Sequence, residues 1–211
     1  MRVVVCDPGV ANVRSVVRAA VRASAGASSS PHVSVSRDPA EVRAADVVIV
    51  PGQGSFGAFA RAIDGGLGDA LRELIARGRP YLGICLGMQV LFESSEEAPG
   101  ERGLGVYPGV VRRLRPGVDP STGAAHALPH IGWNTVDEAT GSSRYFYFAH
   151  SYAVAPADAS LVTATTSYGD DRFASMIAEG AVLGVQFHPE KSQDEGLALL
   201  RSFFSRALGR S

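Results

Sequence analysis

Residues Tyr81–Phe92 read Y-L-G-I-C-L-G-M-Q-V-L-F. The segment begins as a short apolar run, reaches Cys85 between Gly83 and Gly87, and then becomes helical in pattern. The flanking glycines leave room for a backbone that a β-carbon would crowd. The pattern G-x-C-x-G is the cysteine counterpart of the G-x-S-x-G elbow, a sharp strand-to-helix turn above the C-terminal edge of a sheet.

A cysteine at such a turn has two interpretations. At the beginning of a helix, the dipole and the free N–H groups favour a reactive thiolate. Alternatively, Cys85 is a small buried hydrophobic residue, which is the usual state of a free cysteine. The strand before it and the paired glycines make the two interpretations comparably strong, and the reactive one requires a base elsewhere in the chain.

Composition limits the kind of protein. The chain has 211 residues, with 45% apolar and 19% charged residues and a formal net charge of −1. This length suits one domain over residues 1–211, or at most two small ones. The near-neutral charge argues against nucleic acid as the main partner. No apolar run approaches the roughly 18–20 residues that a membrane helix needs.

Location is inferred from the N-terminus and the cysteines. The chain begins M-R-V-V-V-C-D and enters a strand at once, so we expect no signal peptide. Cys6 and Cys85 do not make a disulfide framework. The cytosol, where thiols stay reduced, is the expected compartment.

Strands and helices alternate through the first part of the chain. This alternation predicts an α/β fold with an open, mostly parallel sheet and helices on both faces. The expected strands are Val3–Cys6, His32–Ser36, Asp46–Val50 and Tyr81–Ile84, and the expected helices follow Asn12 and cover Phe56–Ile63 and Leu67–Arg77.

Strand patterns dominate after Gly105, and several of them are expected to be antiparallel additions. These runs are Val106–Leu114, Tyr145–Ala149, Leu161–Thr166, Phe173–Ile177 and Val182–Phe187. Arg115–Pro129 is predicted to be a surface loop because it is rich in Pro, Gly and Ala. Gln193–Leu208 closes the chain as an amphipathic helix.

A candidate base follows the last of these strands, in the run G-V-Q-F-H-P-E that ends at Glu190. Residues i and i+2 of an extended chain share a face, so Glu190 can reach and orient the imidazole of His188. An acid has this role in a nucleophile–base–acid triad. The alternative is a surface His-Pro-Glu turn. Cys85 and His188 both follow strand ends, where open α/β sheets place their ligand crevice.

An acyl-transfer site also needs donors for an oxyanion. Leu86 offers a backbone N–H directly after the cysteine, and the Pro51–Gly54 segment, P-G-Q-G, offers a second near Gly54. Taken alone, that segment favours a plain turn, and only its combination with the cysteine elbow points to an oxyanion donor.

Together the motifs P-G-x-G, G-I-C-L-G-M-Q and F-H-P-E resemble the class I, triad-type glutamine amidotransferases, which have a flavodoxin-like fold. Further segments resemble the glutamine amidotransferase subunits of imidazole glycerol phosphate synthase, a family of histidine biosynthesis. The match runs from Val3 to the last helix; Gln53 and Ala11 depart from the family pattern. The segments that carry it are Asn12–Val16, Pro51–Gly57, Pro129–Asn134, Tyr147–Tyr152 and His188–Gln193.

The resemblance implies a mechanism. The Cys85 thiolate attacks the amide carbon of glutamine, N–H groups near Gly54 and Leu86 hold the oxyanion, and His188, steadied by Glu190, protonates the leaving ammonia. Water then hydrolyses the cysteinyl thioester to glutamate. The residues that the resemblance places against the bound glutamine are Gln89, Ser151 and Tyr152; Gln89 also lies one helical turn past the cysteine, on the same side.

The resemblance also implies a partner, a (β/α)8-barrel cyclase subunit. Ammonia channelled to this subunit of the heterodimer produces imidazole glycerol phosphate and aminoimidazole carboxamide ribotide (AICAR). Asn12, Trp133 and Lys191 are placed at the interface. No sequence motif suggests a phosphate-binding loop, a metal site or a cofactor.

Three alternatives remain open. A cysteine peptidase or hydrolase on the same elbow would use Cys85 and His188 but leaves the Pro129–Asn134 segment unexplained. A pseudo-enzyme that only docks a partner conflicts with the intact triad. Another triad amidotransferase would feed a different synthase, and the Lys191–Gln193 segment, K-S-Q, argues against it.

Overall fold

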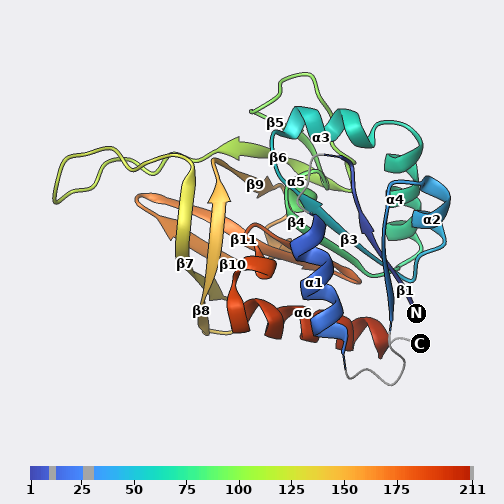
Figure 1. The fold of residues 1–211 in the computed structure, drawn as a ribbon. Coiled ribbons are helices and arrows are strands. Elements are labelled where there is room, and N and C mark those ends of the chain that lie inside the picture. Colours follow the sequence, from blue (N-terminus) through green and yellow to red (C-terminus); the bar gives the residue numbers. More distant parts are fainter. Residues whose placement is uncertain (10–12, 26–30, 210–211) are drawn as a thin grey trace.

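A nine-stranded sheet forms the centre of the molecule (Figure 1). The computed structural model describes residues 1–9, 13–25 and 31–209. Five strands are parallel and lie in the order β2-β1-β3-β4-β12, the flavodoxin-like arrangement. Their bounds are Arg2–Cys6 for β1, His32–Ser36 for β2, Val47–Gly52 for β3, Tyr81–Cys85 for β4 and Val182–Val185 for β12.

Antiparallel strands continue the sheet in the order β11-β10-β7-β8. They cover Asp171–Glu179 (β11), Val162–Tyr168 (β10), His130–Glu138 (β7) and Ser143–His150 (β8). A second, three-stranded sheet has the order β5-β6-β9, with bounds Phe92–Ser95, Tyr107–Arg113 and Tyr152–Pro156.

Helices cover both faces of the parallel strands (Figure 1). Alternating side chains of the buried strand β1 divide between two cores. Val3 and Val5 pack with α1 and α6, whereas Val4 packs in the cluster that includes α2, α3 and α4. The bounds are Val13–Ser24 (α1), Pro39–Arg43 (α2), Phe56–Ile63 (α3), Gly66–Ala76 (α4), Leu86–Gln89 (α5) and Gln193–Leu208 (α6), with short 3₁₀ turns at Ala159–Leu161 (η1) and Pro189–Lys191 (η2).

The predicted fold class is confirmed, including the helices on both faces and the antiparallel additions. Among the described residues, the helices and strands that were not expected are α2, β5, β7 and β9, and the 3₁₀ turns η1 and η2 were not expected either. Strand β7 interrupts its apolar residues with Gly132, whose φ is 138°, and with polar side chains, so its sequence lacks a clear two-residue period. Within the described residues, no helix has both the length and the apolar character needed to cross a membrane.

Candidate active site

The predicted strand-to-helix turn is present at Cys85. Strand β4 ends at this residue and α5 begins at the next. Cys85 has φ 54°, a left-handed conformation that is rare outside glycine and that concentrates at functional sites. A β-carbon at Gly87 would lie 1.8 Å from the Val50 carbonyl oxygen, and one at Gly83 would lie 2.4 Å from the Gly87 oxygen. The two glycines are therefore required by close backbone approach.

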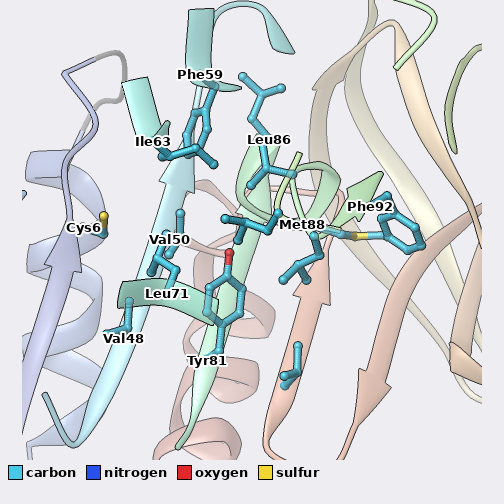
Figure 2. Close-up of a cluster of buried hydrophobic side chains, with 14 of the residues drawn as sticks. Cys6, Val48, Val50, Phe59, Ile63, Leu71, Tyr81, Leu86, Met88 and Phe92 are labelled. Atoms are coloured by element: carbon cyan, nitrogen blue, oxygen red, sulfur yellow. The ribbon is translucent and has the colours of Figure 1, made fainter. Parts of the chain in front are cut away.

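A buried tyrosine forms a hydrogen bond with the turn from the core side. The Tyr81 hydroxyl donates a hydrogen bond of 2.7 Å to the Gly87 carbonyl oxygen, and Figure 2 shows this ring in the core with its oxygen directed toward the turn. Burial raises the pKa of Tyr81 well above its ordinary value, so the hydroxyl stays protonated and can donate. Cys6, by contrast, lies fully buried on β1, and burial together with the charge of Asp7 raises the pKa of its thiol to about 12.

His188 and Glu190 form the predicted pair. His188 Nδ1 lies 2.8 Å from Glu190 Oε1, and the two side chains are only 3% and 4% exposed. Burial lowers the pKa of His188, but hydrogen bonds to Cys85 and Glu190 and the charges of both outweigh it and raise the pKa to about 10. Because Nδ1 is engaged by the carboxylate, Nε2 is the ring nitrogen left for the sulfur.

The base is held by its backbone as well as by its side chain. The His188 N–H donates to the Tyr147 carbonyl oxygen at 2.8 Å. Ser192 Oγ donates to the His188 carbonyl oxygen at 2.7 Å and accepts from the Tyr147 N–H at 3.0 Å. The peptide of Tyr147, on β8, thus fixes the position of the turn that carries the imidazole.

Most of the predicted residues line one cavity of about 400 Å³. This volume is typical of small-molecule sites. Glu190 lies behind His188 rather than in the wall. The predicted residues that line the cavity are Gly54, Cys85, Leu86, Gln89, Ser151, Tyr152 and His188.

The loop after β3 lies directly against the turn. Gly52 pairs in register with Cys85, and a β-carbon on Gly52 would lie 2.3 Å from Leu86 Cβ. Gly54 has φ +90°, a conformation natural to glycine. This close approach places the backbone of both predicted oxyanion donors, Gly54 and Leu86, in the wall of the cavity beside the sulfur.

Gln89 contributes an acceptor to the cavity. Its Nε2 donates to the Tyr152 carbonyl oxygen at 2.9 Å and to Gln186 Oε1 at 3.0 Å, so both N–H bonds are used. The amide oxygen of Gln89 is what remains for a ligand that carries N–H groups. Glu97 adds a carboxylate to the same wall; its Oε2 accepts the Phe56 N–H at 2.7 Å.

Comparisons with known proteins identify the family of this chain. The family model described as glutamine amidotransferase class-I matches residues 4–207. The chain is 39% identical to imidazole glycerol phosphate synthase subunit HisH of Pyrococcus furiosus, covering 96% of this chain and 97% of that one. It is 42% identical to the HisH subunit of Aromatoleum aromaticum, covering 97% and 98%. The chain belongs to the HisH family of class-I glutamine amidotransferases.

Solved structures show the same fold as this HisH family member. A crystal structure of a glutamine amidotransferase superposes with a TM-score of 0.72 at 21% identity, over 97% of this chain and 98% of that one. The glutaminase domain of Trypanosoma brucei CTPS with bound acivicin superposes with a TM-score of 0.69 at 18% identity, over 99% and 94%. The family resemblance drawn from the sequence is confirmed.

Several residues around the HisH site were missed by the sequence reasoning. Glu97 lies in a turn with no motif of its own, so no sequence signal marks it. Gln186 is fully buried beside Cys85, and the signal available in the sequence was its position just before His188, at the end of the last predicted strand. His130 and His150 are buried and adjoin the same site.

Two of the predicted interface residues, Trp133 and Lys191, do not line the cavity. Trp133 is 47% exposed on β7, with its ring 6.2 Å from that of Tyr147 on β8. Lys191 is exposed in η2, with Nζ 5.7 Å from the centre of the Tyr147 ring. The third residue, Asn12, lies outside the described residues. The described part of the chain has no cluster of His, Cys, Asp and Glu side chains suited to a metal ion.

Proposed function

We propose that Cys85, His188 and Glu190 hydrolyse glutamine in this chain, which as a HisH family member is a glutamine amidotransferase subunit of imidazole glycerol phosphate synthase. The observation that carries the proposal is the left-handed Cys85 in one cavity with His188, whose other ring nitrogen is held by a buried carboxylate. We further propose that residues 1–211 act as a single amidotransferase domain.

The chemistry is acyl transfer through a thioester. The Cys85 thiolate attacks the side-chain amide carbon of glutamine. The oxyanion that forms accepts hydrogen bonds from N–H groups of the Gly54 loop and of Leu86. His188 gives its Nε2 proton to the leaving ammonia. It then takes a proton from the water that attacks the thioester, which releases glutamate and regenerates the thiolate.

The cavity walls suit the amino-acid end of glutamine. The free amide oxygen of Gln89 and the carboxylate of Glu97 are acceptors for N–H groups, including the α-ammonium group. Ser151, between β8 and β9, and Tyr152, the first residue of β9, line the same cavity. We propose that these residues bind the substrate.

We propose that the partner is a (β/α)8-barrel cyclase, and that it docks on the face of β7 and β8 that carries Ile131, Trp133, Tyr145 and Tyr147. The first three side chains are 62%, 47% and 61% exposed. Cross-strand pairing of Trp133 with Tyr147 puts these residues on one face of the sheet. Exposed aromatic side chains are typical anchors of protein interfaces.

The barrel would receive ammonia directly. In this heterodimer, formed in the cytoplasm, the cyclase uses the ammonia to make imidazole glycerol phosphate and AICAR. Lys191 lies next to the triad residue Glu190 and over the Tyr147 ring, so an acidic residue of the barrel that pairs with Lys191 would act one residue from the triad.

Labelling with acivicin tests the site. We expect the reagent to modify Cys85 and to spare Cys6, and Cys85→Ala to abolish glutamine hydrolysis in the assembled synthase while the protein stays folded. The measurements are peptide mass mapping, glutamate release and thermal melting. A label on Cys6, or glutamine hydrolysis by the folded Cys85→Ala variant, would overturn the assignment.

A further inference from the structure

A chain of hydrogen bonds enters the active site from the inner face of β7 and β8. Asn134 Nδ2 lies 3.2 Å from His130 Nε2, and His130 Nδ1 lies 3.2 Å from His150 Nε2. His150 Nδ1 lies 2.8 Å from the Tyr152 carbonyl oxygen, in the cavity wall. The two imidazoles therefore link β7 to the substrate cavity.

The Tyr152 carbonyl oxygen at the end of this chain fixes which atom donates in each hydrogen bond between the imidazoles. A carbonyl oxygen only accepts, so His150 carries its proton on Nδ1, and its Nε2, when neutral, must accept. His130 then donates from Nδ1, and its Nε2 accepts the amide N–H of Asn134. Burial lowers the pKa of His130 to about 4 and that of His150 to about 3, so both rings are neutral as this arrangement requires.

The chain continues to the nucleophile. The Tyr152 oxygen that accepts from His150 also accepts from Gln89 Nε2, at 2.9 Å. The second N–H of Gln89 goes to Gln186 Oε1 at 3.0 Å, which turns the Gln186 amide so that its Nε2 donates to Cys85 Sγ at 3.5 Å. The orientation of the Gln186 amide is thus set by neighbours outside the triad.

We propose that Gln186 is a further catalytic residue, which donates an N–H to the Cys85 thiolate, and that His130 and His150 are positioning residues that hold its amide in the donating orientation. This inference rests on the proposed role of Cys85 as nucleophile. We call the hydrogen-bonded series Asn134, His130, His150, the Tyr152 carbonyl, Gln89 and Gln186 the buried relay.

Because Gln186 is buried, a flipped side-chain amide would be energetically costly. Gln186 is 0% exposed and Gln89 is 2% exposed, so solvent does not compensate for a misdirected amide. If the Gln186 amide were flipped, its oxygen would face the thiolate and its NH₂ would face the NH₂ of Gln89. Two repulsive contacts would replace two hydrogen bonds, one of them to an anion, in surroundings where unpaired polar groups are costly.

The alternative is that the relay only satisfies buried polar groups, as most proteins must. Variants at both ends distinguish the two explanations. Gln186→Met keeps a chain of similar length without an N–H donor. His130→Phe keeps a ring between those of Phe148 and Tyr168, whose centres lie 4.9 and 4.1 Å from that of His130, but cannot donate to His150. His130→Asn restores a donor at the Nδ1 position.

The control variant is Tyr168→Phe. It removes the 2.8 Å hydrogen bond from the Tyr168 hydroxyl to the Ala127 carbonyl oxygen, next to the same imidazole but outside the relay. The readout is the rate at which iodoacetamide alkylates Cys85 in the free full-length chain, followed by mass mapping across neutral and alkaline pH. Buried Cys6 is the internal reference, and thermal melting monitors folding.

We expect Gln186→Met to slow alkylation of Cys85 at neutral pH by about tenfold and to move the pH profile upward, because a hydrogen bond to a charged group is lost. His130→Phe should slow alkylation severalfold, whereas His130→Asn and Tyr168→Phe should match the wild type. Equal rates in folded wild type and Gln186→Met would overturn the role of Gln186. A normal rate in folded His130→Phe would overturn the relay.

A failure of the nucleophile assignment gives a different result. If acivicin leaves Cys85 unmodified in the wild-type synthase, the catalytic assignment fails, and this inference fails with it. If Cys85 is modified and the alkylation rates of the variants are unchanged, only the inference fails.

Discussion

Replacing Glu190 by glutamine removes the charge from the most deeply buried ion pair of the site while keeping its shape. In the native protein, His188 Nδ1 lies 2.8 Å from Glu190 Oε1. A glutamine oxygen can still accept this proton, so the imidazole keeps its orientation. What is lost is the negative charge that helps to raise the pKa of His188 to about 10 against the opposing effect of burial.

The size of the effect follows from the burial of the pair. With side chains 3% and 4% exposed, solvent screens the interaction little. A hydrogen bond to a charged group contributes about 1.5–3 kcal/mol, and a neutral one about 0.5–1.5 kcal/mol. The difference of about 1–2 kcal/mol corresponds to about a 5- to 30-fold fall in turnover. Glu190→Ala, which also loses the orientation, should fall by about 10- to 150-fold.

The assay is glutamate release by the assembled synthase at saturating partner and glutamine. The pH profile should shift as well, because the pKa of His188 falls when the carboxylate is gone and burial remains. In a His188→Ala background, adding Glu190→Ala should cost nothing more, since the two act as a unit. Equal activity of wild type and Glu190→Ala, or an additive loss in the double variant, would refute the reasoning.

Three further changes test other parts of the structure. Lys191→Ala should lower cyclase turnover driven by glutamine but not turnover driven by added ammonium salt, both measured at saturating partner; equal loss in both would place Lys191 in the partner's own chemistry or in assembly. Gly87→Ala should lower the free energy of unfolding by about 1–3 kcal/mol in urea titrations, since its β-carbon would meet the Val50 oxygen; unchanged stability would contradict the close approach. Asp171→Asn should cost about 2–3 kcal/mol, because its 7% exposed carboxylate pairs with an arginine at 2.7 Å, whereas Asp69→Asn on the surface should cost less than about 0.5 kcal/mol. Burial raises the pKa of Asp171, but the hydrogen bond and the charge of the arginine outweigh burial and leave the pKa below 3.8. The stability that the ion pair contributes is therefore present above pH 3.8 and is lost as the pH falls through the lowered pKa. Equal losses of stability at Asp171 and Asp69 would contradict the difference in burial.

The fold and the turn at Cys85 were predictable because their determinants are local. Alternating strand and helix patterns specify a parallel sheet, and the glycines around Cys85 mark a backbone that only they allow. The contact between His188 and Glu190 was predicted from an extended segment, but the extended conformation is wrong: Glu190 lies in the 3₁₀ turn η2, and this turn brings its carboxylate to the imidazole. The family is confirmed, whereas the catalytic roles remain predictions that the acivicin experiment tests.

The parts that were missed depend on pairing between distant segments. Strand β7 carries a glycine at φ 138° and is held by pairing with β8 and β10. The orientation of Gln186 depends on Gln89, which lies far away in sequence, and the protonated nitrogen of His150 depends on the Tyr152 carbonyl. No residue pattern encodes which way an amide or an imidazole points.

The hydrogen bonds between β8 and the turn after β12 also protect the edge of the sheet. Strand β8 is the last strand of the large sheet, and an exposed edge of this kind is a template for another strand. Tyr147, near its middle, already gives its N–H to Ser192 and its carbonyl to His188. A foreign strand therefore cannot pair along the whole edge, and a partner must bind through side chains rather than by adding a strand. Amide hydrogen exchange would show this as slow exchange at Tyr147 in the free chain, and fast exchange there would mean that the edge is open.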